Sequence, residues 1–151
     1  MPERRRMSEI LASHATLKLA TSGGGLSPWI ATAYFAADGL FCLEILIEKQ
    51  GNTLANIRAD ARVAVMIEDG VPSHPFAQGW GRAVVAETAE RAPFASRIAG
   101  KTPSSEPLVS LPHLLPVRLL IERWRITDLE AGWLPAREIA ASDAGGAAAA
   151  G

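Results

Sequence analysis

The stretch from Gly51 to Asp69 constrains the fold of this chain more than any other. It opens with Asn52 and Thr53, whose side chains are of the kind that cap the N-terminus of a helix. Apolar side chains then recur at helical spacing, at Leu54, Ile57 and Ala61. This spacing predicts a short amphipathic helix at the start of the stretch.

The second half of the stretch predicts a buried strand. The segment Ala59–Arg62 is typical of a turn, and the strand follows over Arg62–Glu68. Its centre, Val63–Ile67, is apolar on both faces. Because such a strand needs cover on both sides, we expect a barrel interior against one face and a helix or a partner subunit against the other.

Three strand-like segments precede this stretch. They are Leu17–Thr21, Trp29–Phe35 and Leu40–Ile47. The pair Asp38-Gly39 lies between the second and third and is a strong signal for a tight hairpin. The sequence therefore predicts three consecutive antiparallel strands.

A glycine-punctuated strand, Ala77–Glu87, follows the central stretch. In it Gly79 and Gly81 flank Trp80. Glycine inside a strand marks a bend or a close approach by another group. Bending during barrel closure explains both glycines, and we favour it over a ligand that lies against the strand.

The ends of the chain add helices and a last strand. We expect a helix over Met7–Ser13 with Ser8 as its N-cap, and a second helix from Thr88 to a stop at Gly100. After an irregular proline-rich segment, Val117–Thr127 predicts the last strand. The predicted fold is therefore mainly β with α: a six-stranded antiparallel barrel of Greek-key type with short flanking helices.

Composition narrows the range of partners and compartments. A chain of 151 residues with 48% hydrophobic and 21% charged residues is typical of one globular domain, expected over residues 1–140, with an Ala/Gly-rich tail over 141–151. The net charge of −1 argues against nucleic-acid binding. Without an apolar segment long enough for a membrane span or a signal peptide, we expect a cytoplasmic protein. The single cysteine, Cys42, is expected in the core.

The usual catalytic motifs are absent from the sequence. It contains no GxxxxGK[ST], no GxGxxG after a strand and no HExxH. The run Gly23–Gly25 precedes a proline and a strand, so a hairpin linker explains it better than a phosphate loop. The histidines, His14, His74 and His113, are too widely spaced to predict a metal site, although one of them could serve as an axial haem ligand.

One segment has the composition of an anion site. Lys49 offers a positive charge, and Asn52 and Thr53 offer donors beside the unpaired N–H groups of the first helical turn. A simple helix cap with a solvated lysine explains the same residues, and on this local pattern it is the stronger interpretation. Glu44 and Glu48 are explained by an exposed face of the third strand.

The order of these elements resembles the FMN-binding split β-barrel family related to pyridoxamine 5′-phosphate oxidase. The matching pieces span Leu17 to Ile126 and are individually short: Leu19-Ala20-Thr21, Asn56-Ile57, Asp60-Ala61-Arg62-Val63-Ala64-Val65 and Gly81-Arg82-Ala83. The resemblance implies a homodimer with FMN at the subunit interface. It also implies an oxidoreductase in which the flavin carries the redox chemistry, with no catalytic acid or base assigned.

The resemblance implies specific cofactor contacts as well. The second strand, through Trp29, Ile30, Ala31 and Thr32, would lie along the flavin, largely through backbone groups. The segment with Lys49, Asn52 and Thr53 would meet the phosphate. Gln78 would make a polar contact to the cofactor, and Trp133 would lie near the site of the partner subunit.

The chain departs from the family pattern at the phosphate. Gly51 stands where the family often has Ser, and Thr53 stands where it has Lys. A charge-assisted contact is about twice as strong as a neutral one, so phosphate affinity should be reduced. Pyridoxamine phosphate oxidase activity itself is not expected. The alternatives are the same fold binding deazaflavin F420 or haem, and a dimeric interaction module without a cofactor.

Overall fold

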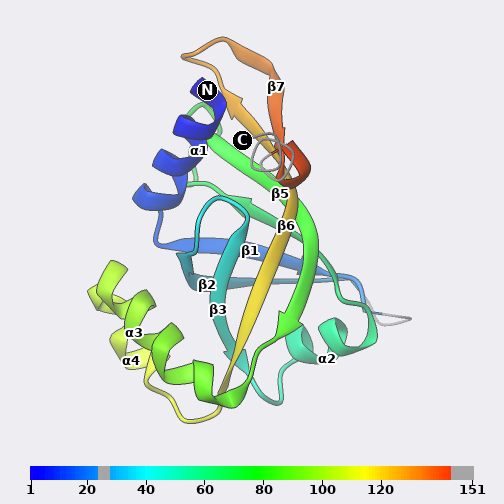
Figure 1. Cartoon of the computed structure of the whole chain (residues 1–151), viewed down its shortest axis with the longest axis vertical. Coiled ribbons are helices and arrows are strands. Elements are labelled where there is room, and N and C mark those ends of the chain that lie inside the picture. Colours follow the sequence, from blue (N-terminus) through cyan, green and yellow to red (C-terminus); the bar gives the residue numbers. More distant parts are fainter. Residues whose placement is uncertain (24–27, 144–151) are drawn as a thin grey trace.

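The computed structural model describes residues 1–23 and 28–143. Its strands form one antiparallel sheet in the order β3-β2-β1-β4-β5-β6-β7, and β3 also pairs with β6 (Figure 1). The strands are β1 (Thr16–Thr21), β2 (Trp29–Ala37), β3 (Cys42–Glu48), β4 (Arg62–Ile67), β5 (Phe76–Val85), β6 (Leu114–Asp128) and β7 (Trp133–Ala140). The pairing of β3 with β6 closes the first six strands into the predicted antiparallel barrel, and β7 lies outside it.

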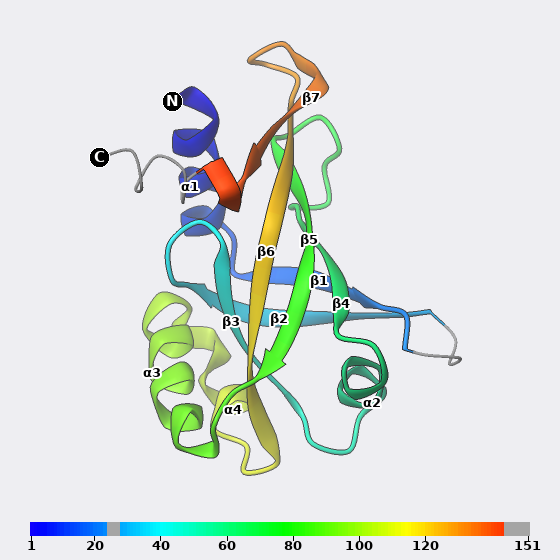
Figure 2. The same ribbon diagram turned by 45° about the vertical axis from the view of Figure 1, so that its right-hand side comes forward.

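Short helices flank this barrel. They are α1 (Pro2–Ser13), α2 (Asn52–Ala59), α3 (Arg91–Lys101) and α4 (Glu106–Val109), with 3-10 turns at Thr88–Glu90 and Pro103–Ser105. Figure 2 shows α2 on one side of the barrel and α3 with α4 on the other. None of the helices in the described part of the chain is long and apolar enough to cross a membrane.

The barrel interior is filled by the inward side chains of alternating positions. Every strand of the barrel contributes fully or almost fully buried residues, among them Leu19, Phe35, Ile45, Ile67, Ala77 and Leu119. Helix α2 adds Leu54 and Ile57 to the same core. The predicted amphipathic helix therefore packs its apolar side against the barrel.

The two glycines of β5 lie against β6. A Cβ on Gly81 would lie 1.9 Å from the carbonyl oxygen of Leu120, and one on Gly79 would lie 2.6 Å from the ring of Trp124. The register of the two strands shifts between Trp80 and Gly81, as in a β-bulge. Close approach of β6 at this bend accounts for both glycines, in agreement with the barrel-closure interpretation.

Helix α2 begins differently from the prediction. Gly51 is its N-cap residue, and no side chain caps the helix, so the caps predicted at Asn52 or Thr53 are wrong. The extended backbone of Gly51 lets its carbonyl accept the N–H of Ala55 at 3.3 Å, which starts the helix without a side chain. Ala61 lies beyond the helix end and is exposed.

Other helix boundaries also required correction. Helix α1 begins at Pro2, which suits the first turn of a helix, so Ser8 lies inside it and is no cap. Thr88 starts a 3-10 turn without a side-chain cap. Helix α3 passes through Gly100, which lacks the positive φ of a helix-ending glycine, and ends at Lys101.

The C-terminal half contains more structure than the sequence pattern predicted. The segment expected to be irregular holds α4 and the start of β6 at Leu114, and β7 was not expected. Within residues 1–23 and 28–143, strand β7 pairs with β6 alone, so it is an edge strand that tolerates Pro135. Such a strand lacks the alternating pattern from which buried strands are predicted. The linker at Gly24 and Gly25 and the tail after residue 143 lie outside the described residues.

Glu44 of β3 is buried, contrary to the expected exposed face. It is 3% exposed, and Arg97 of α3 donates to both carboxylate oxygens, at 2.6 and 2.8 Å. The prediction failed because α3 covers this part of β3. Cys42, at the start of the same strand, is partly buried, and this burial raises the pKa of its thiol.

Candidate functional site

The barrel splits between β2 and β3. Strand β2 pairs with β1 from Trp29 to Tyr34, but its recorded pairing with β3 covers only Phe35–Ala37. The Phe35 N–H donates to the carbonyl of Ala15, on the β1 side, at 3.3 Å. Because backbone groups alternate along a strand, those of Ile30 and Thr32 face away from β1, toward the split.

A pocket of about 300 Å³ occupies this split, and we call it the α2 pocket. Its walls come from β2, the end of β3, the first turn of α2, and single residues of β1, α4 and β6. They are Leu19, Trp29, Ala31, Thr32, Ala33, Leu46, Ile47, Glu48, Gly51, Asn52, Thr53, Leu108 and Leu114. The pocket therefore joins one strand edge to one helix N-terminus.

The α2 pocket has an apolar body and a polar end. The side chains of β1, β2, β3, α4 and β6 that line it are mostly aliphatic. At the other end, Asn52 and Thr53 make no capping bond, and the first N–H groups of α2 lack partners within the helix. A ligand with a flat, largely apolar ring and one polar substituent fits this distribution.

The charges at the polar end are mixed. Lys49 is exposed between β3 and α2, and its backbone N–H donates to the carbonyl of His113 at 2.9 Å. The carboxylate of Glu48 is close by, since a Cβ on Gly51 would lie 3.4 Å from its Oε2. The donors thus suit a phosphate, whereas Glu48 opposes it.

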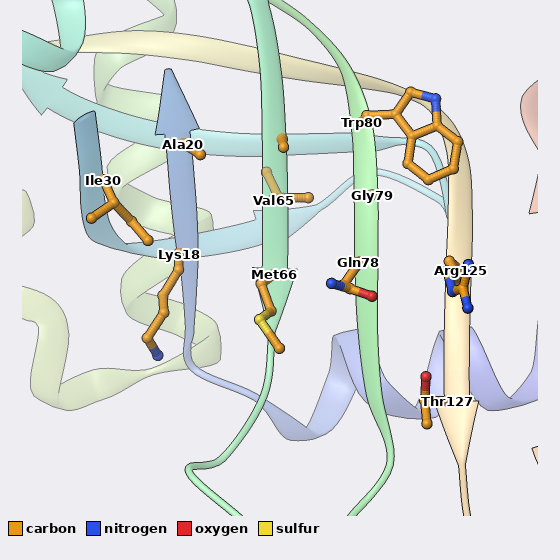
Figure 3. A pocket seen from close by; sticks show the side chains of 11 residues that line it. Lys18, Ala20, Ile30, Val65, Met66, Gln78, Gly79, Trp80, Arg125 and Thr127 are labelled. Carbon is orange, nitrogen blue, oxygen red and sulfur yellow. The ribbon is translucent and has the colours of Figure 1, made fainter. Parts of the chain in front are cut away.

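A second pocket, of about 540 Å³, lies on the outer face of the sheet formed by β1, β4, β5 and β6 (Figure 3). We call it the sheet-face pocket. Its lining combines small and apolar side chains of β1 and β4 with Trp80 and a polar group made by Gln78, Arg125 and Thr127. Ile30 closes it on the β2 side and is 65% exposed.

One ion pair borders the sheet-face pocket. Lys18, which lines it, donates to the carboxylate of Glu68. The hydrogen bond from Lys18, with a second one from the N–H of Gly70, holds the pKa of Glu68 below its usual range. Arg125 has no recorded ion-pair partner among the described residues.

The structure places the nine predicted cofactor residues in several locations. Five line the α2 pocket: Trp29, Ala31, Thr32, Asn52 and Thr53. Ile30 and Gln78 line the sheet-face pocket instead. Within one protomer the predicted contacts are therefore divided between two surfaces.

The remaining two predicted residues lie outside both linings. Lys49 is exposed and directly follows Glu48, a lining residue of the α2 pocket, in the chain. Trp133 is 6% exposed at the start of β7, with the guanidinium of Arg137 4.8 Å from its ring centre. Its role near a partner subunit stays a prediction.

Several pocket residues were missed from the sequence. Leu108 and Leu114 belong to a proline-rich segment with no recognisable period, so no local pattern could assign them. Arg125 could have been predicted from the sequence, because the alternation around Trp124 places it on the outer face of β6.

No protein-family model matches the chain, and no curated protein matches it. Several solved structures, however, superimpose on the chain. A heme binding protein from Mycobacterium smegmatis superimposes with a TM-score of 0.71 at 16% identity, covering 89% of this chain and 56% of that one. HutZ, a heme storage protein from Vibrio cholerae, gives 0.65 at 18% identity, covering 78% of this chain and 89% of HutZ.

A protein described as a pyridoxamine 5′-phosphate oxidase is among the similar structures too. A candidate pyridoxamine 5′-phosphate oxidase from Listeria innocua superimposes with a TM-score of 0.68 at 21% identity, covering 83% of this chain and 98% of that one. Identities at this level establish the fold alone. The chain has the split-barrel fold of proteins related to pyridoxamine 5′-phosphate oxidase.

Proposed function

We propose that this protein is a homodimeric flavoprotein that binds FMN in the α2 pocket and acts as an oxidoreductase. The observation that carries the proposal is the convergence of five predicted cofactor residues on one pocket where the barrel splits. The bound flavin would supply the redox chemistry, and the chain would bind it, orient it and exclude water.

The open edge of β2 supports a flavin in particular. The outer ring of isoalloxazine carries alternating carbonyl and N–H groups, which match the backbone groups of Ile30 and Thr32 that face the split. The aliphatic walls formed by Leu46, Leu108 and Leu114 would pack on the apolar part of the ring. Binding through backbone groups and aliphatic walls would not depend on a particular sequence motif.

The outer sheet face supports the homodimer. Ile30 and Trp80 are 65% and 40% exposed, and the small residues Ala20 and Ala64 lie between them on β1 and β4. Large apolar side chains grouped on one sheet face are typical of an interface. A second copy on this face would also provide the cover that the apolar β4 requires.

Titration with flavins tests the proposal. FMN added to the purified protein should lose fluorescence on binding, and riboflavin should bind almost as well, because neutral donors and Glu48 surround the phosphate end. Thr53→Lys should tighten FMN about five-fold, or about 1 kcal/mol, without tightening riboflavin. The matched control is Ala55→Lys, one exposed position further along α2, which should change neither affinity.

Two results would contradict the proposal. One is a protein that is colourless when purified and gives no spectral change with FMN or riboflavin. The other is an equal effect of Thr53→Lys and Ala55→Lys on FMN affinity, which would place the phosphate elsewhere. A bound deazaflavin would be recognised by its own absorption and would replace FMN in the same pocket.

Haem is the second candidate ligand. Two of the similar structures are described as haem proteins, and the exposed His113 immediately precedes Leu114 of the α2 pocket. If haem binds there, His113→Ala should shift or remove its Soret band, whereas His74→Ala should not. A titration without any saturable Soret change would remove this candidate.

A further inference from the structure

A third cavity lies away from both pockets, between α1, the β2–β3 turn and α3. It measures about 540 Å³ and is lined by Ser8, Leu11 and Ala12 of α1, Ala37, Gly39 and Leu40 around the turn, and Lys101 of α3. Figure 2 shows the turn between α1 and α3, on the side of the barrel opposite α2. We call it the Lys101 cavity.

Lys101 is the one charged side chain of this lining. It is partly buried, its Nζ lies 3.4 Å from the ring centre of Phe35, and its one recorded hydrogen bond is a long contact of 3.5 Å to the Phe35 carbonyl. No ion pair with a carboxylate is recorded for it among the described residues, whereas Lys18, another of the three lysines, pairs with Glu68.

The surroundings of the cavity add little negative charge. Arg97, one turn earlier on α3, is paired with Glu44, and Arg5 on α1 lies near Glu9. Asp38 in the β2–β3 turn is exposed, and no ion pair joins it to Lys101 within the described residues. Burial, without a compensating acid, lowers the pKa of Lys101 to about 8, while the Phe35 ring face favours the ammonium form.

We propose that the Lys101 cavity binds a small apolar monocarboxylate, with the carboxylate on Lys101 Nζ and the hydrocarbon body against Leu11 and Leu40. The volume lies in the range of ligand pockets, and the walls are aliphatic except at Ser8 and Lys101. A carboxylate would supply the counter-charge that the fold leaves out. The site is separate from the proposed flavin pocket and does not depend on it.

Binding of octanoate, measured by calorimetry and by NMR shift mapping, tests this assignment. At pH 7 octanoate should bind saturably and shift signals of α1 and α3, while 1-octanol, which has the same body without the charge, should bind at least ten-fold more weakly. Lys101→Met should remove the difference between the two probes, and Lys101→Arg should keep it. Arg58→Met, at an exposed position of α2, is the control and should bind octanoate like the wild type.

The pH dependence provides a second measurement. Because the ammonium form is required, octanoate affinity should fall about ten-fold or more between pH 7 and pH 9.5, as Lys101 loses its proton. Thermal unfolding of each variant verifies that it is folded. Equal octanoate binding by the wild type and folded Lys101→Met, or no saturable binding at millimolar octanoate, would overturn the proposal.

Discussion

At the scale of the residue, the fold depends on a few unusual positions. At some of them only a glycine fits, and at others a charged side chain that is normally exposed lies buried. Gly81 is the clearest case, because the backbone of β6 occupies the space of a Cβ. Glu44 is the opposite case, since a carboxylate lies in the interior with a single cation, Arg97, as its partner. Both positions are decided by a neighbouring element distant in sequence.

The space around each glycine predicts opposite changes in stability for two Gly→Ala substitutions. Gly81→Ala should lower the free energy of unfolding by about 3 kcal/mol or more, because the new methyl would overlap the Leu120 carbonyl. Gly100→Ala lies inside α3 with open space around it and should raise stability by about 0.5–1 kcal/mol. Urea unfolding of both variants measures the contrast, and similar changes in the two would refute it.

The Glu44–Arg97 pair predicts an asymmetry. Arg97→Met leaves the almost fully buried carboxylate without its partner and should cost about 2 kcal/mol or more. Glu44→Met should cost less, because the half-exposed Arg97 side chain can turn to water. Denaturation midpoints of the two single variants test the order, and a larger loss for Glu44→Met would contradict it.

At the scale of the element, α1 is held on the outside of the barrel by both apolar and charged contacts. Met7, Ile10 and Leu11 form its buried side. Arg6 Nε lies 2.7 Å from Oδ2 of the fully buried Asp128 at the end of β6, and Glu3 accepts a hydrogen bond from Arg137 of β7. Helix α1 therefore joins the two ends of the described chain.

Neighbouring arginines of α1 should differ in importance. Arg6→Met removes the counter-charge of buried Asp128 and should lower stability by about 2 kcal/mol. Arg5→Met removes an exposed side chain 3.9 Å from Glu9 and should change stability by less than about 0.5 kcal/mol. Equal thermal shifts for the two variants would show that the Asp128 contact does not hold α1 in place.

At the scale of the whole molecule, carboxylates paired on the surface connect segments far apart in the chain. Lys18 on β1 holds Glu68 after β4, and Arg137 on β7 holds Glu3 on α1. Asp60, at the α2–β4 turn, accepts hydrogen bonds from Arg62 and Ser22. Each of these contacts favours the ionised carboxylate.

These contacts predict loss of stability in acid. Hydrogen bonds from Arg62 hold the pKa of Asp60 well below its ordinary 3.8, and Lys18 lowers that of Glu68 below 4.5. The unfolded chain therefore binds protons at a higher pH than the folded chain, and the stabilisation present above about pH 4.5 declines as the pH falls. Urea midpoints from pH 6 to pH 3 should decrease, with a shallower decrease in Asp60→Asn. A flat profile would contradict this account.

The sequence by itself determined the order and type of most elements, because their signals are local. The Asp38-Gly39 hairpin, the helix and strand within Gly51–Asp69, and the glycines of β5 can be recognised from neighbouring residues alone. Element order was then enough to predict a six-stranded barrel, and five of the nine predicted cofactor residues do line one pocket beside α2.

Tertiary structure decided what depends on contacts distant in sequence. The pairing of β3 with β6 closes the barrel and places Leu114 opposite Glu48 at the α2 pocket, which Leu108 of α4 also lines. The same packing buries Glu44 under α3 and leaves Lys101 in an apolar cavity. No local period encodes these features, because burial and charge compensation are set by whichever element happens to cover a side chain.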